Sequence, residues 1–356
     1  MEVSNLTEIF QSNFSLSPKQ TSVFPYLKEF LLATKILSPF WVAVILFGLI
    51  ANVINIVVFL RAGAKDNVTV LLLSLAVSDL VFLVLITPSM CRFVIFTLAA
   101  RSYQLPFDPA ILAFLFYWPA FTSYDLSSFI SVSLGVMRCA CVAMPLKFKF
   151  VFTKSRTIKW VVFLVILAVA LRLPVLTINR LAVRLDPTTN ASVLFLKQVN
   201  RASMSRINDI INRGFVIYVN YITMVTCVCV LTFKLYQAAK IRRSCTSQLP
   251  QSSEKLSNKP DDQRLSSKDL QVVKSVVLVC TIFILSQLTF LVTSTIRLID
   301  PEFDAGANLD FLFGIFSQVS RTCSYLNSSI NIFVYYNYNT QFRSVFRSLL
   351  CVKCKT

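Results

Sequence analysis

The chain has 356 residues, of which 55% are apolar and only 15% are charged, and its formal net charge is +18 at pH 7. Soluble domains carry about 25% charged residues, so this composition excludes an ordinary soluble protein and predicts a membrane protein. The sequence contains no histidine. This excludes Ser-His-Asp and Cys-His catalysis and removes the commonest metal ligand.

Seven mostly apolar stretches are each long enough to cross a hydrocarbon core of about 30 Å. They lie at 38–62, 69–96, 110–141, 157–178, 213–238, 271–297 and 309–336. The third, fifth and seventh are interrupted by polar residues, so their assignment also depends on the regular spacing. Residues 1–37 lack the basic start and short apolar core of a signal peptide, so we expect the first stretch to act as its own insertion signal. We expect these residues to form an extracellular N-terminal segment, on the orientation argued below. The predicted fold class is an all-α membrane protein, with a seven-transmembrane-helix bundle over 38–336.

Basic residues gather in the segments that follow the first, third, fifth and seventh stretches, for example Arg61, Lys147, Arg242 and Arg343. Short cytoplasmic loops are enriched in Lys and Arg, so we expect the N-terminus outside and the C-terminus in the cytosol. The positive charge is then explained by topology and by attraction to the inner leaflet, and it is no sign of nucleic-acid binding.

This topology assigns roles to three loop segments. Asn5, Asn13 and Asn190 begin Asn-x-Ser/Thr triplets on the outer side and are predicted glycosylation sites, whereas Asn67 falls inside and should carry no sugar. Residues 242–268 are rich in Ser, Lys and Gln and predict a disordered cytosolic loop whose serines could be phosphorylated.

Asp79 lies in the middle of the second stretch, within SLAVSDL. An ionised carboxylate at this depth costs about 2.5–3.5 kcal/mol on insertion scales, so it requires a partner or a function. The other polar residues at membrane depth include Asn52, Ser127, Asn327, Ser328 and Asn331. If their faces turn inward, they would surround the carboxylate with hydroxyl and amide groups. The alternative is that they only hydrogen-bond neighbouring helices together.

The order of these motifs resembles the rhodopsin-like (class A) family of G-protein-coupled receptors. GLIANV is similar to the family's GxxxN, SLAVSDL to its LAxxD, and NSSINIFVY to its NSxxNPxxY. Arg138 in MRCACVAMPLKF takes the place of the family's arginine, and Trp160 and Phe283 match its tryptophan of span 4 and phenylalanine of span 6. QFRSVFRSLLC resembles the short amphipathic eighth helix, so 337–356 is expected to hold this helix and the C-terminal tail.

The resemblance implies a plasma-membrane receptor that binds an extracellular small molecule or peptide and activates heterotrimeric G proteins by helix rearrangement. Arrestin and receptor kinases are further expected partners, and no catalysis is expected. The family's central sodium pocket would correspond to Asp79, as the metal ligand, with Ser127, Asn327, Ser328 and Asn331. Cys351 and Cys354 follow the amphipathic segment in a basic context and are predicted acylation sites.

Arg138 is the predicted G-protein switch. The family places an acid directly before this arginine, but this chain has Met137 there. We therefore expect Arg138 to pair with Asp269 on span 6 in the resting state and with backbone carbonyls or Tyr335 when the bundle opens.

Several family residues are missing. The outer end of span 3 and the 179–212 loop lack the cysteines of the usual disulfide, Gln287 and Thr289 replace the tryptophan and proline of span 6, and Ile332 replaces the proline of span 7. Because prolines kink membrane helices, spans 5 to 7 should be straighter than in a typical member. Phrases such as KDNVTVLLLSLAVSDL look most like orphan chemosensory-type receptors of molluscs.

By position in the family, the ligand pocket would include Ala120, Phe121, Tyr124, Gln287, Phe290 and Gln318. Ala120 stands where amine receptors have aspartate, so an amine ligand is not expected. Asp125, one turn deeper, is either a ligand group or an interhelical hydrogen-bond partner. The basic 178–212 loop and the acidic 299–310 loop either attract each other over the pocket or steer an acidic ligand inward.

Two other classes of function compete with a receptor. A seven-span channel or transporter would be expected to show repeats and broken helices, and the two halves share no internal repeat. An intramembrane enzyme would need a catalytic dyad, and the acids clearly at depth, Asp79 and Asp125, occur in no recognisable catalytic motif.

Overall fold

The computed structural model describes residues 27–63, 66–99, 108, 111, 114–143, 148, 150–185, 192–246, 267–300, 302–304 and 307–351. The long helices are α2 (Leu27–Ala62), α3 (Asn67–Ala99), α5 (Tyr117–Ala143), α7 (Lys154–Leu176), α9 (Ile217–Thr246), α10 (Ser267–Ile299) and α11 (Asp310–Ser329). The shorter elements are β1 (Asn179–Leu185), β2 (Ser192–Gln198), α8 (Arg201–Asn208), the π-helix η2 (Asp209–Val216), α12 (Asn331–Tyr338) and α13 (Thr340–Cys351).

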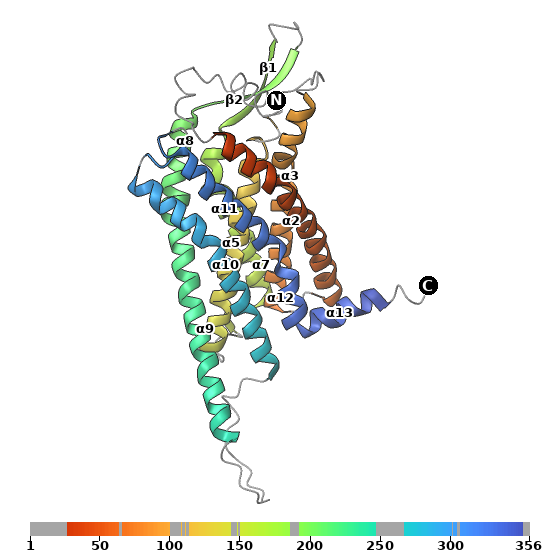
Figure 1. The fold of residues 1–356 in the computed structure, drawn as a ribbon. Helices are drawn as coiled ribbons and strands as arrows, with labels where there is room; N and C mark the ends of the chain where they lie inside the picture. Colours follow the sequence, from red (N-terminus) through yellow and green to blue (C-terminus); the bar gives the residue numbers. More distant parts are fainter. Residues whose placement is uncertain are drawn as a thin grey trace, which may run out of the picture.

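Helices α3 and α5 lie at the centre of the bundle (Figure 1). Helix α3 packs against α2, α5, α7 and α11, and α5 packs in addition against α9 and α10. One buried apolar cluster, around Leu75, Ile130 and Phe283, fills the half nearer α13, and a second, around Phe82 and Tyr325, fills the other half. Polar residues gather between these clusters, where the sequence predicted a polar centre.

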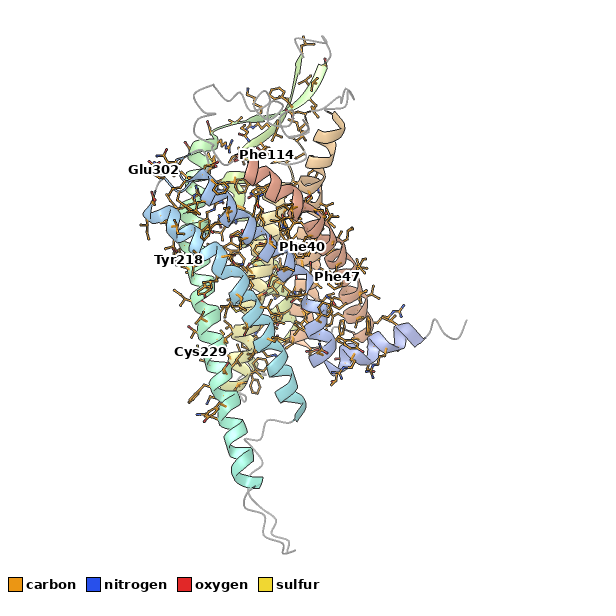
Figure 2. The ribbon with its side chains drawn as sticks, viewed as in Figure 1. Phe40, Phe47, Phe114, Tyr218, Cys229 and Glu302 are labelled. Atoms are coloured by element: carbon orange, nitrogen blue, oxygen red, sulfur yellow. The ribbon has the colours of Figure 1, made fainter. Side chains whose placement is uncertain are left out.

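The outer surface of the helices is apolar. Phe40 and Phe47 on α2 are 46% and 41% exposed, and Cys229 on α9 is also exposed (Figure 2). By length and hydropathy, six described segments could cross a membrane: Ile36–Ala62, Asn67–Met90, Tyr117–Val142, Lys154–Leu176, Ser203–Lys234 and Val277–Ile299. Apolar side chains facing outward over such lengths are expected where lipid replaces water as the solvent.

The seventh predicted stretch is not one uninterrupted helix. Helix α11 ends at Ser329 and α12 begins at Asn331, with Ile330 between them in a tight turn. The carbonyl oxygen of Ile330 accepts a hydrogen bond from Phe333 N at 3.1 Å. That this span is straighter than in a typical family member stays a prediction. Asn331 and Ser328 flank the turn and bond to neighbouring helices, which compensates for the interrupted backbone pattern.

The fifth stretch begins earlier than predicted and changes its helical form. Helix α8 and the eight-residue π-helix η2 precede α9, so Asn208 and Asn212 lie in helix and not in the predicted loop. Helix α9 continues to Thr246 and α10 begins at Ser267, and the rest of the predicted 242–268 loop lies outside the described residues.

A β-hairpin, which the all-α prediction omitted, projects beyond the end of the bundle that carries α8 (Figure 1). Strands β1 and β2 pair antiparallel, with Leu181 opposite Leu196 and Val183 opposite Leu194. These branched and apolar residues favour strand pairing. The amide of Asp108 also donates to Leu194 O at 2.8 Å, which links the hairpin to the segment before α5.

Helix α13 leaves the bundle sideways (Figure 1). Asn339 precedes it and accepts a hydrogen bond from Phe342 N at 3.0 Å, an N-terminal cap. The ring of Phe342 packs against Phe59 and Tyr335, which anchors the start of α13 to the bundle.

Candidate functional site

Asp79 on α3 is fully buried, and its carboxylate is surrounded by the neutral side chains of Ser127, Ser328 and Asn331. Ser127 Oγ on α5 donates to Oδ1 at 2.6 Å, and Asn331 Nδ2 on α12 donates to Oδ2 at 3.0 Å. None of the ion pairs among the described residues involves Asp79. An ionised Asp79 therefore has hydrogen-bond donors but no protein cation beside it.

The other predicted members of this centre are buried around it. Asn52 on α2 donates through Nδ2 to Gly48 O at 2.9 Å and to Ser328 O at 2.8 Å, which joins α2 to α11. Ser328 and Asn327 are 0% and 7% exposed. The structure thus brings Asn52, Asp79, Ser127, Ser328 and Asn331 into one polar centre between α2, α3, α5 and α11–α12, and Asn327 is buried next to Ser328 on α11.

These groups fit a sodium ion. Hard cations prefer oxygen ligands, and Asp79 supplies two carboxylate oxygens and a negative charge. The buried hydroxyl of Ser328 lies beside the Asp79 carboxylate and is a further oxygen close to it. Ser127 provides a second hydroxyl beside the carboxylate.

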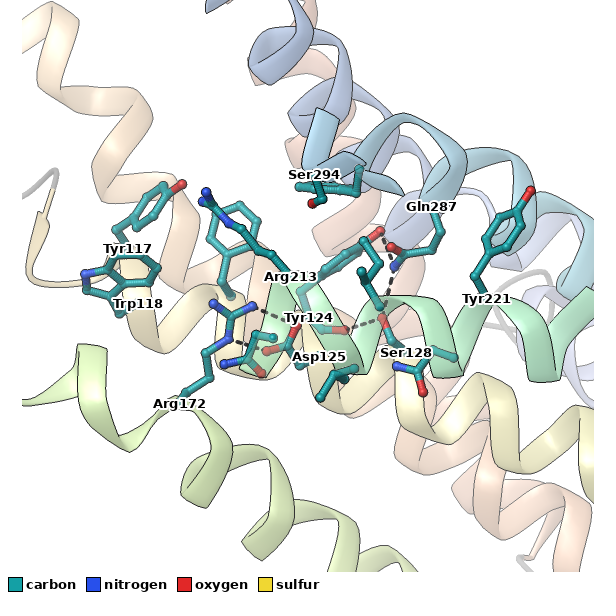
Figure 3. A pocket seen from close by; sticks show the side chains of 16 residues that line it. Tyr117, Trp118, Tyr124, Asp125, Ser128, Arg172, Arg213, Tyr221, Gln287 and Ser294 are labelled. Carbon is teal, nitrogen blue, oxygen red and sulfur yellow. Dashed lines mark hydrogen bonds and ion pairs between the residues drawn. The ribbon is translucent and has the colours of Figure 1, made fainter. Parts of the chain in front are cut away.

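A separate cavity of about 80 Å³ lies between α5, α7, η2, α9 and α10 (Figure 3). Its lining residues are Tyr117, Trp118, Phe121, Tyr124, Asp125, Ser128, Arg172, Asn212, Arg213, Val216, Ile217, Asn220, Tyr221, Gln287, Phe290 and Ser294. Four of the six predicted pocket residues are among them. The other two, Ala120 and Gln318, are buried elsewhere and do not line it.

Gln287, at the position of the family's tryptophan, connects the cavity to α5. Its Nε2 donates to Ser128 Oγ at 3.1 Å and to the Tyr124 hydroxyl at 3.3 Å (Figure 3). Ser128 follows Ser127, the donor to Asp79. The cavity and the polar centre are therefore held by adjacent residues of one helix.

Asp125 makes the interhelical contact that was one of its two predicted roles. Arg172 on α7 donates to both carboxylate oxygens, from Nε to Oδ2 and from Nη2 to Oδ1, the latter at 3.0 Å. Arg172 Nη1 also donates to Asn208 Oδ1 at 3.1 Å. A bidentate pair of this kind holds α5, α7 and α8 together beside the cavity. Sequence reasoning missed Arg172, although an arginine within an apolar stretch requires such a partner.

A second set of ion pairs joins the helix ends on the side of the β-hairpin. Arg297 at the end of α10 contacts Asp209 of η2 at 3.5 Å and also pairs with Asp304. Asp209 in turn contacts Arg213 at 3.3 Å. Arg297 thus connects Asp209 of the basic 178–212 segment to Asp304 of the acidic 299–310 segment. The net charges of the two loops alone did not indicate this pairing.

The predicted switch residues lie near the other end of the bundle. Arg138 is half-buried on α5, and Met137 beside it is buried. Tyr335 is 1% exposed, packs edge-on against Phe59, and its hydroxyl has no hydrogen-bond partner among the described residues. Asp269 lies in the first turn of α10, and its side chain is outside the described residues, so its pairing with Arg138 stays a prediction.

The predicted glycosylation sites Asn5, Asn13 and Asn190 and the acylation site Cys354 lie outside the described residues, as does the side chain of Cys351. Asn67, predicted to carry no sugar, donates to Phe152 O at 2.5 Å, in the connection between α5 and α7. The two acids considered for an intramembrane enzyme have different partners, Asp79 with Ser127 and Asn331 and Asp125 with Arg172.

A model of the seven-transmembrane receptors of the rhodopsin family matches residues 51–335. A comparison with curated proteins gave no match. The matched region extends from the end of the GLIANV motif to Tyr335 and contains Asp79, Arg138 and the whole cavity lining. The motifs and the helical bundle agree with it, and the chain belongs to the rhodopsin family of seven-transmembrane receptors.

Proposed function

We propose that this chain is a plasma-membrane receptor that binds a small extracellular ligand in the cavity beside Gln287 and activates heterotrimeric G proteins. The observation that carries the proposal is the link through adjacent serines: Ser128 accepts a hydrogen bond from Gln287 at the cavity, and Ser127 donates to Asp79. A ligand that moves Gln287 acts on the same turn of α5 that holds the buried carboxylate.

In this proposal α11 and α12 together form the seventh span, and the hairpin end of the bundle faces outward. Helix α13 lies on the inner leaflet, because its apolar residues Phe342 and Phe346 pack toward the bundle while the exposed Arg347 can reach lipid phosphates. Arrestin and receptor kinases would act at this cytosolic face. The likeness to molluscan chemosensory-type receptors supports a chemosensory ligand.

A sodium ion at Asp79 is part of the proposal. It would neutralise the carboxylate in the resting packing, with Ser127 and Ser328 as further oxygen ligands. A ligand that binds one of two helix arrangements better shifts the population toward it, and an ion that prefers the other arrangement opposes that shift. Extracellular ligand and sodium should therefore antagonise each other.

The test is G-protein activation in cells that express the full chain, with and without a panel of small extracellular compounds. Arg138→Ala is the matched variant, because it removes the proposed cytosolic switch far from the cavity. We expect activation by the wild-type chain and loss of activation in Arg138→Ala at equal surface expression. Equal activation by both proteins would contradict the proposed switch.

A further inference from the structure

The cavity contains an arginine whose hydrogen-bonding capacity is only partly used. Arg172 is 8% exposed, and its hydrogen bonds within the described residues use three N–H groups, two toward Asp125 and one toward Asn208. A guanidinium has five N–H groups. Two N–H groups of a buried cation thus remain for an acceptor at the cavity wall, and the strongest acceptors for arginine are anionic oxygens.

The side-chain amide of Asn212 has an unused hydrogen-bond acceptor. Its Nδ2 donates to Leu171 O at 2.9 Å and to Asn208 Oδ1 at 3.0 Å. Its own Oδ1 is buried and has no hydrogen-bond partner among the described residues. A buried acceptor without a donor is destabilising, and Asn212 belongs to the cavity lining, so a ligand hydroxyl that reached this oxygen would supply its missing donor.

These two incomplete groups are neighbours. Arg172 and Asn212 both donate to the same oxygen, Asn208 Oδ1, at 3.1 and 3.0 Å. Asn212 and Arg213 are presented by the π-helix η2, a backbone form that is rare and is often found at functional sites. The π-helix therefore positions one acceptor and one further cation at the same cavity.

The charge and the shape of the lining narrow the ligand class. Two arginines, Arg172 and Arg213, and one carboxylate, Asp125, line the cavity, while the carboxylate partner of Arg213, Asp209, lies outside the lining. Trp118, Phe121 and other rings supply its apolar wall. A free volume of about 80 Å³ suits a molecule of only a few heavy atoms unless side chains at the opening move aside.

We propose that the ligand is a small carboxylic acid with a neighbouring hydroxyl group. Its carboxylate accepts hydrogen bonds from the two remaining N–H groups of Arg172 and is attracted by Arg213, and its hydroxyl donates to Asn212 Oδ1. Its apolar part packs against the aromatic wall. This assignment rests on the proposed function, since it names the ligand class of the same pocket.

The experiment measures thermal unfolding of the purified full-length protein with two matched sets of probes. One set is lactate, propionate and lactamide, and the other is 3-phenyllactate, 3-phenylpropionate and 3-phenyllactamide. Within at least one set we expect the hydroxy acid to raise Tm most, the acid without hydroxyl less, and the amide not at all. Two results would overturn the assignment: an amide that raises Tm as much as its acid does, or a failure of every carboxylic acid to raise Tm.

Variants then assign the contacts. Arg172→Lys keeps a cation for Asp125 but loses the fork geometry, so the acid concentration for half-maximal stabilisation should rise at least about tenfold. Asn212→Val should abolish the advantage of the hydroxy acid over the acid without hydroxyl. Thr226→Val is the control, because Thr226 is exposed on α9 and bonds only to Ile222 O of its own helix. Unchanged binding by Arg172→Lys would contradict the proposal.

A second variant separates loss of binding from loss of folding. Asp125→Asn with Arg172→Gln replaces the buried ion pair by two neutral amide groups, which can hydrogen-bond to each other and leave no unpaired buried charge. This double variant should fold and no longer respond to acids. The acids are also tested for G-protein activation in cells: stabilisation without activation contradicts the proposed function alone, and activation by amines instead of acids contradicts the ligand class alone.

Discussion

Asn331 Nδ2 donates to Asp79 Oδ2 at 3.0 Å, and Asn331 is the first residue after the break between α11 and α12. The turn at Ile330 thus lies beside the buried carboxylate. A change in the charge or the ligands of Asp79 acts directly on the segment that leads to Tyr335 and α13. The interruption of the helix occurs without the proline that often kinks membrane helices.

Replacing Asp79 by Asn should remove the sodium dependence of stability. Asparagine keeps the shape of the side chain but has no charge to hold a cation. We expect NaCl to raise Tm of the wild-type protein relative to an equal concentration of choline chloride, and to have no such effect on Asp79→Asn. Sodium stabilisation that persists in Asp79→Asn would contradict a site at this carboxylate.

Gly48 should tolerate no side chain. A Cβ atom at this position of α2 would lie 2.2 Å from Ser329 Oγ and 2.6 Å from Leu83 Cδ1. Overpacking of this kind costs about 1–3 kcal/mol, so Gly48→Ala should lower Tm. Adding Ser329→Ala removes the nearer clash and should recover part of the loss, which a double-mutant cycle of unfolding measures. Equal stability of Gly48→Ala and wild type would show that α2 and α11 are not this close.

The Arg172–Asp125 pair should be much less tolerant of single than of paired substitution. Arg172→Met leaves a buried carboxylate without its cation, which costs about 3–5 kcal/mol. The double variant Asp125→Asn with Arg172→Gln should retain most of the stability. Surface expression and thermal unfolding check this, and a double variant as unstable as Arg172→Met would contradict the pairing.

Asp269→Ala should raise basal G-protein activation. If Asp269 holds Arg138 in the resting state, removing the carboxylate frees the guanidinium for the active arrangement. Basal activation is compared at equal surface expression, with Glu254→Ala in the predicted 242–268 loop as the matched loss of one acidic charge. Unchanged basal activation in Asp269→Ala would refute the lock.

The long apolar helices could be predicted because hydropathy and length decide a membrane span largely from local sequence. The polar centre followed from the same logic, since Asp79 is expensive at membrane depth without partners such as Ser127. The break at Ile330 and the π-helix η2 could not be predicted. Both depend on contacts from other helices, such as Asn212 with Leu171 O, and have no proline to mark them.

The cavity lining likewise contains residues that the sequence predicted and residues that it did not. Phe121, Tyr124, Gln287 and Phe290 were found by position in the family, and the structure places them in the lining. The role of Arg172 on α7 was missed because its partners come from two segments far apart in the sequence, Asp125 on α5 and Asn208 on α8. Only the presence of one arginine in an otherwise apolar stretch could have indicated it.

The most direct test of the account is G-protein activation by the full chain in cells, compared between wild type, Gln287→Leu and Arg138→Ala at equal surface expression. Gln287→Leu keeps the size of the side chain but breaks the contacts with Ser128 and Tyr124. We predict activation by the wild type, an altered ligand response in Gln287→Leu and no activation in Arg138→Ala. Surface-expressed wild-type protein that activates no G protein but conducts ions or solutes would contradict the account.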